Sequence, residues 1–81
     1  MAIILTAHAA LMLAERGITL DWITQTIAEP DRQEPDPRDP AVTRSFRQLA
    51  EAGGRVLRVA HRTDGIDIRV VTAFLDRGAR P

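Results

Sequence analysis

The sequence predicts an α+β fold in a single domain over residues 1–81: a short N-terminal strand, a helical hairpin, and an antiparallel sheet of three to four strands. Two apolar stripes at helical spacing in the first half, each preceded by a threonine, predict the hairpin. In the second half, apolar and polar residues alternate around an Asp-Gly pair, which predicts paired strands. The chain has 81 residues, 44% of them hydrophobic, and this size suits one small core.

The first predicted helix covers about residues 6–16 and follows a short apolar strand at residues 2–5. Thr6 suits the N-cap, because its hydroxyl can accept a hydrogen bond from an unpaired backbone N–H group of the first turn. Gly17 suits the left-handed residue that ends a helix. The apolar stripe predicted to face the core consists of Ala7, Ala10, Leu11, Ala14 and Ile18.

The second predicted helix starts after Thr19, carries Asp21 in its positively polarised first turn, and ends before Pro30. Trp22 lies close to its apolar stripe and is expected to pack against the core, as a single tryptophan usually does. The residues predicted to form the buried stripe are Leu20, Ile23 and Ile27.

A proline-rich acidic segment separates the helices from the sheet. Four of the five prolines lie at positions 30–40, so this segment is expected to be extended and poorly ordered, apart from an edge strand near residues 32–34. It also divides the charge. Residues 1–42 hold three arginines and seven acids, whereas residues 43–81 hold eight arginines and four acids, with no lysine anywhere. A basic second half suggests a phosphate or an acidic partner.

The sheet is predicted from a hairpin that turns at Asp64-Gly65 and pairs Thr63 with Ile66 and Val59 with Val70. Alternation then divides the strands into two faces. The residues predicted to face the helices are Leu57, Val59, Ile66, Ile68, Val70 and Phe74. The residues predicted to face outward are Arg58, Arg62 and Arg69.

A further strand at about residues 43–49 leads into the loop before the hairpin. A four-residue loop would place Phe46 opposite Val59 in the core and Arg47 opposite Arg58 outside. Like charges directly opposite each other are unfavourable in a sheet, so this arrangement predicts an anion site. The alternative is that these guanidinium groups spread into water at little cost.

The segments TAHAALMLAERGI, AEPDRQEPDPRDP, GGRVLRV and VVTAF follow one another in that order. Together they resemble the bacterial family called domain of unknown function 4258, over almost the whole chain. Met12 stands where the family pattern has an arginine. The matching positions are His8, Ala9, Glu15, Arg16, Gly17, Ile18, Pro30, Asp31, Val71, Thr72, Ala73 and Phe74.

That family looks like a relative of the RelE/ParE toxin superfamily, whose fold is a helical hairpin packed on an antiparallel sheet. The resemblance implies the toxin of a toxin–antitoxin system. Such a toxin would cleave free or ribosome-bound mRNA, or poison gyrase, and a cognate antitoxin would cover its basic surface.

The preferred functional hypothesis is RNA binding by the basic sheet face, with metal-independent endoribonuclease activity. Such cleavage needs a base for the 2′-OH and cations for the developing negative charge. His8 suits the base, because the positive end of a helix favours a neutral imidazole. The hypothesis assigns His8, Arg58 and Arg69 to catalysis and Arg16, Arg47, Arg58 and Arg69 to anion binding. The alternative is a non-catalytic module, a degenerate toxin, whose basic face binds an acidic partner.

Two other residues are assigned structural roles. His61 falls on the core-facing parity and is predicted to be a partly buried, hydrogen-bonded histidine. Arg62 is predicted to be neutralised by Asp67 across the hairpin.

Composition excludes several classes of protein. Without cysteine there is no disulfide and no thiolate zinc site, and no metal or cofactor is expected. No apolar run approaches the roughly 20 residues of a membrane span, and the N-terminus lacks a basic leader, so the expected location is a bacterial cytoplasm. A core this small gains stability from association, so a homodimer is one arrangement to consider.

Overall fold

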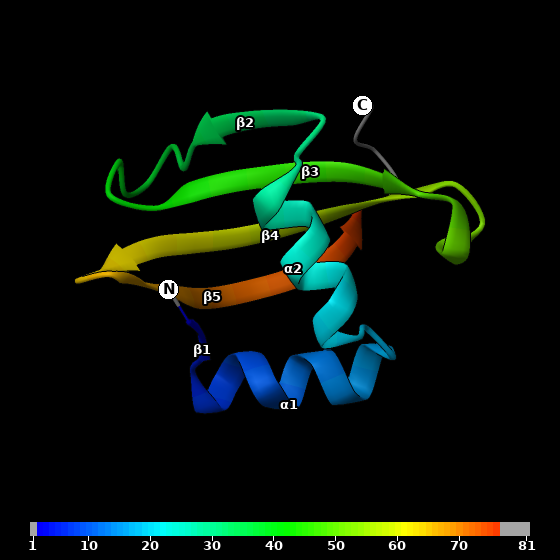
Figure 1. Ribbon diagram of the computed structural model, residues 1–81, viewed down its shortest axis with the longest axis horizontal. Helices are drawn as coiled ribbons and strands as arrows, with labels where there is room; N and C mark the ends of the chain where they lie inside the picture. The colour runs from blue at the N-terminus through cyan, green and yellow to red at the C-terminus, as the bar shows by residue number, and fades with distance from the viewer. Residues whose placement is uncertain (1, 77–81) are drawn as a thin grey trace.

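The computed structural model describes residues 2–76 and gives an α+β fold (Figure 1). The helices and strands, in chain order, are β1 (Ile3–Leu5), α1 (Ala7–Arg16), α2 (Leu20–Ala28), β2 (Arg32–Pro35), β3 (Thr43–Leu49), a short 3-10 helix η1 (Ala50–Ala52), β4 (Arg55–Asp64) and β5 (Asp67–Asp76). The predicted class and the order of elements are therefore confirmed.

The sheet is larger than predicted. It has five strands in the order β1-β5-β4-β3-β2. Strands β2 to β5 are antiparallel to their neighbours, but β1 joins the edge of β5 in parallel. The predicted number of strands, three to four, was thus too low, because the short edge strands β1 and β2 both join the sheet.

The ends of the two helices confirm the predicted capping residues. The hydroxyl of Thr6 accepts from the backbone N–H of Ala9, and Gly17 ends α1 with φ of 65°. Thr19 caps α2 in the same way. Gly17, which ends α1, and Thr19, which caps the start of α2, lie two residues apart. Together they fix the short turn between the helices.

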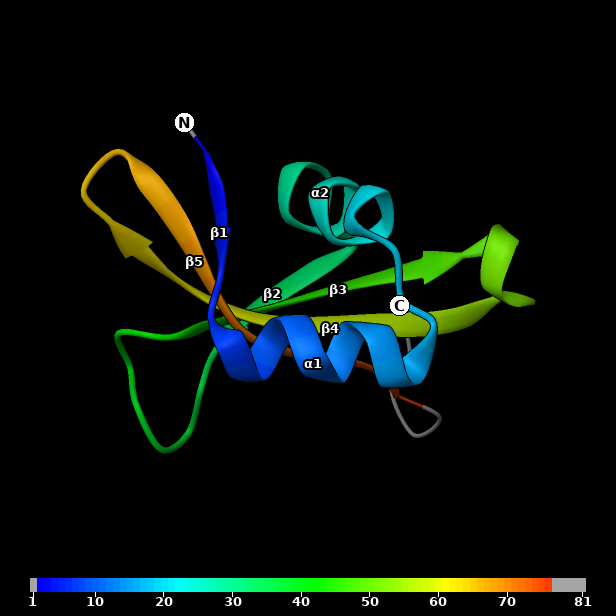
Figure 2. The ribbon, with the colours of Figure 1, turned by 90° about the horizontal axis from the view of Figure 1, so that it is seen from below.

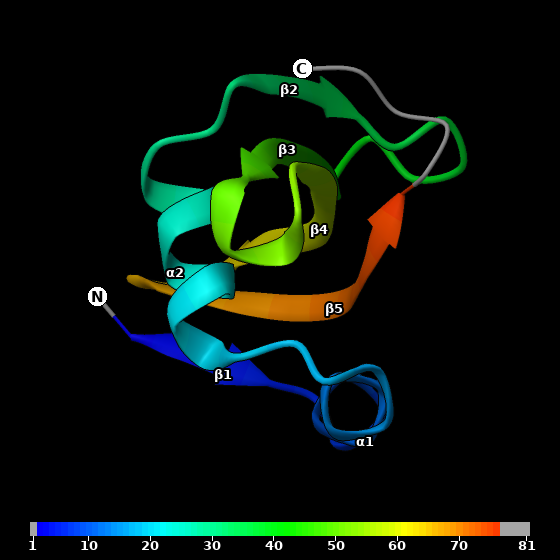
Figure 3. The same cartoon turned by 90° about the vertical axis from the view of Figure 1, so that its right-hand side faces the viewer.

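The two helices take different positions on the sheet. Helix α2 lies across one face, over β3 and β4, whereas α1 runs alongside β5 (Figures 1 and 2). Seen from the right-hand side of Figure 1, α1 is viewed almost end-on, beside β5 and far from β2 (Figure 3). Strand β1 pairs with β5 only from Ile68 to Val70, so α1 flanks the remaining part of that edge.

The predicted apolar stripe was right at Ile18, which is 5% exposed and follows α1, but wrong within the helix itself. Ala9 and Leu13 face the core at 1% and 6% exposure, whereas Leu11 is 58% exposed. Residues 7–14 are apolar nearly all round the helix, so spacing alone did not identify the buried side. In α2, Ile23 is fully buried as predicted, but Leu20, the first residue of the helix, is 52% exposed.

The main core lies between the helices and the sheet. Trp22, Ile27 and Leu75 pack against its edge, which confirms the structural role predicted for Trp22. Its buried residues are Ala9, Leu13, Ile18, Ile23, Leu49, Ala52, Leu57, Val59, Val70 and Ala73.

The register of β3 differs from the prediction by one residue. The link between β3 and β4 has five residues, 50–54, because η1 precedes the two glycines. Phe46 therefore lies opposite Arg58, and Arg47 lies opposite Leu57. A slip of one residue exchanges the two faces of a strand. The predicted neighbours Arg47 and Arg58 are thus on opposite sides of the sheet.

The β4–β5 hairpin also departs from the predicted register. Its turn is Gly65-Ile66, with Asp64 opposite Asp67 and φ of 63° at Gly65. Ile66, predicted to face the core, is 82% exposed in this turn.

A bulge then changes the parity of the rest of β5. Pairing passes from Val70 opposite His61 to Thr72 opposite Ala60, which leaves Val71 as the extra residue. Phe74, predicted to face the helices, consequently lies on the other side, opposite Arg58. The bulge is the physical reason for this error.

The acidic segment is more structured than predicted. The edge strand near residues 32–34 is confirmed as β2, which pairs with β3. After it, the Asp36 carboxylate accepts from the backbone N–H groups of Arg38 and Asp39, and Arg44 donates to its other oxygen. These contacts hold the segment in a defined turn.

Candidate functional site

The face of the sheet opposite the helices, here called the outer face, has a small apolar centre. Phe46 is 2% exposed there, beside Val56 and Ala60, which are also buried. Guanidinium groups lie over its aromatic rings. Arg32 lies 4.0 Å from the ring centroid of Phe46, and Arg58 lies at the same distance from Phe74. These arginines therefore pack as well as carry charge.

Carboxylates of the chain already pair with most arginines of the outer face. Arg58 lies 3.7 Å from Asp76, and Arg69 forms an ion pair with Asp64. The other pairs are Arg32 with Glu34, and Arg44 with Glu34 and Asp36. Burial, followed by the positive charge of Arg44, lowers the pKa of Arg58. The outer face therefore carries neighbouring positive and negative charges, and it is not a uniformly basic surface.

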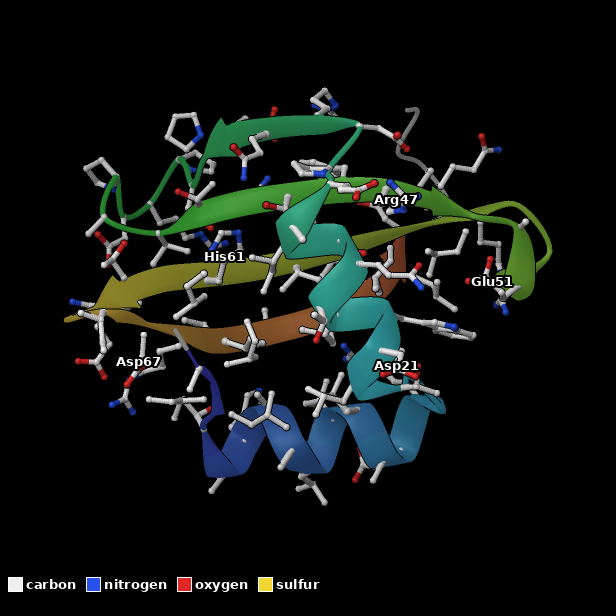
Figure 4. The ribbon with its side chains drawn as sticks, viewed as in Figure 1. Asp21, Arg47, Glu51, His61 and Asp67 are labelled. Atoms are coloured by element: carbon white, nitrogen blue, oxygen red, sulfur yellow. The ribbon has the colours of Figure 1, made fainter. Side chains whose placement is uncertain are left out.

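Arg47 lies on the helix side of the sheet. Its Nη1 donates to the main-chain carbonyl of Glu29, the residue that ends α2 (Figure 4). A guanidinium at this position satisfies one of the unpaired carbonyls of the last helical turn. An open hollow of about 400 Å³ lies beside it, lined also by Thr24, Gln25 and Ala28. Arg47 therefore joins a helix end and is separate from Arg58 and Arg69.

The three predicted catalytic residues do not converge on one point. His8 is exposed in the first turn of α1. Arg69 lies opposite Arg62, which is four residues and so about 13 Å along β4 from Arg58. Arg69 pairs with Asp64, beyond Arg62, and Arg58 pairs with Asp76 in the opposite direction along the strand. The two guanidinium groups therefore do not meet at one phosphate.

Arg62 does not pair with Asp67 as predicted. The two-residue turn places Arg62 opposite Arg69 instead, and the Asp67 carboxylate accepts from the backbone N–H of Ala2. Arg62 is exposed and forms no ion pair with any residue between 2 and 76.

Arg16 is brought close to an arginine that the sequence did not single out. Arg16 and Arg55 line an open cleft of about 490 Å³ with Phe74 and Leu75, at the end of β5. Here this is called the Arg16–Arg55 cleft. Arg16 Nη1 donates to the Ala73 carbonyl, and its guanidinium carbon lies 5.6 Å from the Phe74 ring centroid.

The second arginine of the cleft is fixed by a turn. Arg55 Nε donates to the Ala52 carbonyl of η1 at 2.9 Å. Neither arginine of the cleft forms an ion pair within the described part of the chain. The sequence did not indicate Arg55, because its position beside Arg16 depends on the five-residue link between β3 and β4. The one local signal was its place directly after Gly53-Gly54, where a tight turn starts a strand.

A hydrogen-bond chain, buried at Ser45 and His61, crosses three strands on the helix side. Gln33 Nε2 donates to Ser45 Oγ at 2.9 Å, and Ser45 Oγ lies 2.7 Å from Nε2 of His61. Ser45 is fully buried and His61 is 8% exposed, at the position labelled in Figure 4. The predicted structural role of His61 is therefore confirmed. Because Ser45 accepts from Gln33, its own hydrogen is available to a neutral imidazole.

This chain predicts a loss of stability at mildly acidic pH. Burial lowers the pKa of His61 below its ordinary value of 6.5. Below about pH 6.5 the unfolded chain takes up a proton that the folded protein resists, so the unfolding free energy falls by up to about 1.4 kcal/mol per pH unit. Above about pH 6.5 the contribution of neutral His61 to the unfolding free energy is fully present. Urea unfolding between roughly pH 7 and pH 5 measures the slope.

Two variants test whether His61 causes this change of unfolding free energy with pH. His61→Gln should flatten the slope, and His8→Gln, the same chemical change at an exposed position, is the matched control. The backbone N–H of Arg38 holds the pKa of Asp36 below 3.8, so Asp36 titrates outside this range of pH. Equal slopes in the wild-type protein and the His61→Gln variant would contradict the assignment.

Two further properties concern the chain as a whole. Between residues 2 and 76, no group of three or more His, Asp or Glu side chains could hold a metal ion. None of the helices over the same residues has the length and apolar character needed to cross a membrane.

Comparison with known proteins identifies a family. No curated protein and no solved structure matches the chain. The family model described as Domain of unknown function (DUF4258) matches residues 5–75, which run from the last residue of β1 to near the end of β5. The chain therefore belongs to the DUF4258 family.

Proposed function

We propose that this protein is a non-catalytic binding module of the RelE/ParE toxin type, and that its partner is an acidic protein segment of the kind an antitoxin supplies. The observation that supports this best is the pairing of the outer-face arginines with carboxylates of the same chain. A surface neutralised in this way offers little to a long polyanion, whose binding depends on many unpaired cations.

The overall charge supports the same choice. The chain has 11 basic and 11 acidic residues, and its isoelectric point is about 6.7. Domains that bind nucleic acid through their backbone usually carry a strong positive excess. A module of this composition is better suited to one or two specific charge contacts than to a track of phosphates.

The endoribonuclease hypothesis stays a prediction that the geometry supports less well. His8 lies eight residues from Arg16, about 12 Å along the axis of α1. Arg69 lies opposite Arg62, about 13 Å along β4 from Arg58, and both Arg58 and Arg69 are paired with acids. A general base must reach the proton that it removes while cations contact the same phosphate.

One experiment compares the two functions. The full chain is incubated without metal with single-stranded RNA and, separately, with a short peptide of alternating glutamate and leucine. We expect no cyclic-phosphate RNA ends, no difference between wild type and His8→Ala, and salt-sensitive binding of the peptide. RNA fragments with cyclic-phosphate ends that disappear in His8→Ala would overturn the proposal in favour of the enzyme.

A further inference from the structure

We infer that the Arg16–Arg55 cleft is the site that receives a carboxylate of the acidic partner, with an apolar side chain of that partner against Phe74 and Leu75. This inference rests on the proposed function and names its binding site. It is drawn from the orientation of the two guanidinium groups, from the charges around them and from the walls of the cleft.

Main-chain carbonyls hold both guanidinium groups in place. Arg16 donates to the Ala73 carbonyl at 2.9 Å, and Arg55 donates to the Ala52 carbonyl at the same distance. Each contact uses one of the five N–H donors of a guanidinium group. A neutral carbonyl restricts the side chain without cancelling its charge, so two oriented positive charges remain at one cleft.

The position of β1 makes the Arg16 contact possible. Strand β1 ends its pairing with β5 at Val70, so the edge of β5 beyond it is open to α1. The Ala73 carbonyl can then accept from Arg16, the last residue of α1. A longer β1 would have occupied this carbonyl and displaced the guanidinium group.

The acids near the cleft do not neutralise it. Asp76 lies within ion-pair distance of Arg58, which stacks on the Phe74 ring. Glu15 and Glu51 are close to the cleft arginines in sequence but are exposed and form no ion pair within residues 2–76. The cleft therefore differs from the outer face in having two arginines without carboxylate partners among residues 2–76.

The walls of the cleft favour a protein carboxylate over RNA. Phe74 and Leu75, from the two sides of β5, are the apolar residues that line the cleft next to the two arginines, which suits a carboxylate followed by an aliphatic side chain. Arg58 already stacks on the Phe74 ring at 4.0 Å, which limits stacking of a base on that ring. Arg58 is also paired with Asp76, so it is less available to a phosphate next to the cleft.

The test measures binding of the labelled glutamate–leucine peptide to the full chain by fluorescence anisotropy. We expect Arg55→Gln and Arg16→Gln each to weaken binding by about tenfold, in line with the loss of a charged hydrogen bond. Arg62→Gln is the matched control, because Arg62 is exposed and without an ion pair among the described residues, but lies at the far end of β4. It should bind as the wild type does.

Further measurements distinguish failure of the cleft assignment from failure of the proposed function. Thermal unfolding of each variant shows whether it is folded. If Arg16→Gln is unstable, Arg55→Gln still tests the cleft. A peptide with glutamine in place of glutamate should not bind. If the acidic peptide binds wild type and Arg55→Gln equally well, the cleft assignment fails while the proposed function stands. If only a single-stranded RNA oligonucleotide binds, the proposed function fails as well.

Discussion

Leu13→Ala is expected to remove a large part of the stability of this protein. Leu13 is 6% exposed and packs in the main core between α1 and the sheet. Truncating a buried leucine to alanine costs about 2–5 kcal/mol, through lost burial and the cavity that remains. A domain of 81 residues has a total stability of roughly 4–12 kcal/mol. Urea unfolding followed by Trp22 fluorescence measures the difference.

Leu11→Ala is the matched control for that substitution. It makes the same chemical change two residues earlier in the same helix, at a side chain that is 58% exposed. Its cost should stay within about 0.5 kcal/mol. A larger loss from Leu11→Ala than from Leu13→Ala would mean that α1 turns its other side to the sheet.

Phe46→Ala should be at least as damaging, although Phe46 lies on the face without a helix. Its ring is 2% exposed and lies 4.0 Å from the guanidinium carbon of Arg32. Removing it should cost about 3–5 kcal/mol, the usual loss for a buried phenylalanine. Chemical unfolding of the variant tests whether the outer face has an apolar centre of its own.

Phe46→Leu separates packing from the aromatic contact. Leucine keeps most of the apolar volume but loses the cation–π contact with Arg32, which is worth about 0.5–1 kcal/mol at such sites. It should therefore be much milder than Phe46→Ala. Equal and small effects of both substitutions would show that the ring is solvent-exposed and that the register of β3 is wrong.

The helix boundaries could be predicted because their causes are local. The threonines at both N-caps and Gly17 act within one helical turn of their own positions. The buried side of α1 could not be predicted in this way. Alanine, leucine and methionine surround that helix, so the choice of face depends on the sheet that it contacts.

The faces of the strands depend on single-residue insertions that carry weak sequence signals. The 3-10 helix at Ala50–Ala52 adds one residue to the β3–β4 link, and the bulge at Val71 adds one to β5. Each reverses the alternation beyond it. Arg47 and Phe74 were consequently assigned to the wrong faces, whereas Arg58, Arg62 and Arg69 were assigned correctly.

The candidate site was predicted only in part for the same reason. Residue types correctly indicated that arginines gather on the outer face, but the one ion pair predicted there, Arg62 with Asp67, does not form and the pairs that do form were missed. The Arg44–Asp36 pair needs the turn after β2, and the Arg58–Asp76 pair needs the bulge in β5. Arg16 was singled out from the family resemblance, and its partner Arg55 became visible only in three dimensions.

The most direct test of the central claim is an NMR titration of the arginine Nε–H resonances with the glutamate–leucine peptide. The central claim is that Arg16 and Arg55 are open to an external anion, while Arg58 and Arg69 pair with acids of the chain. We predict saturable shifts at Arg16 and Arg55 and none at Arg58 or Arg69. Shifts concentrated at Arg58 and Arg69, with Arg16 and Arg55 unmoved, would contradict the account.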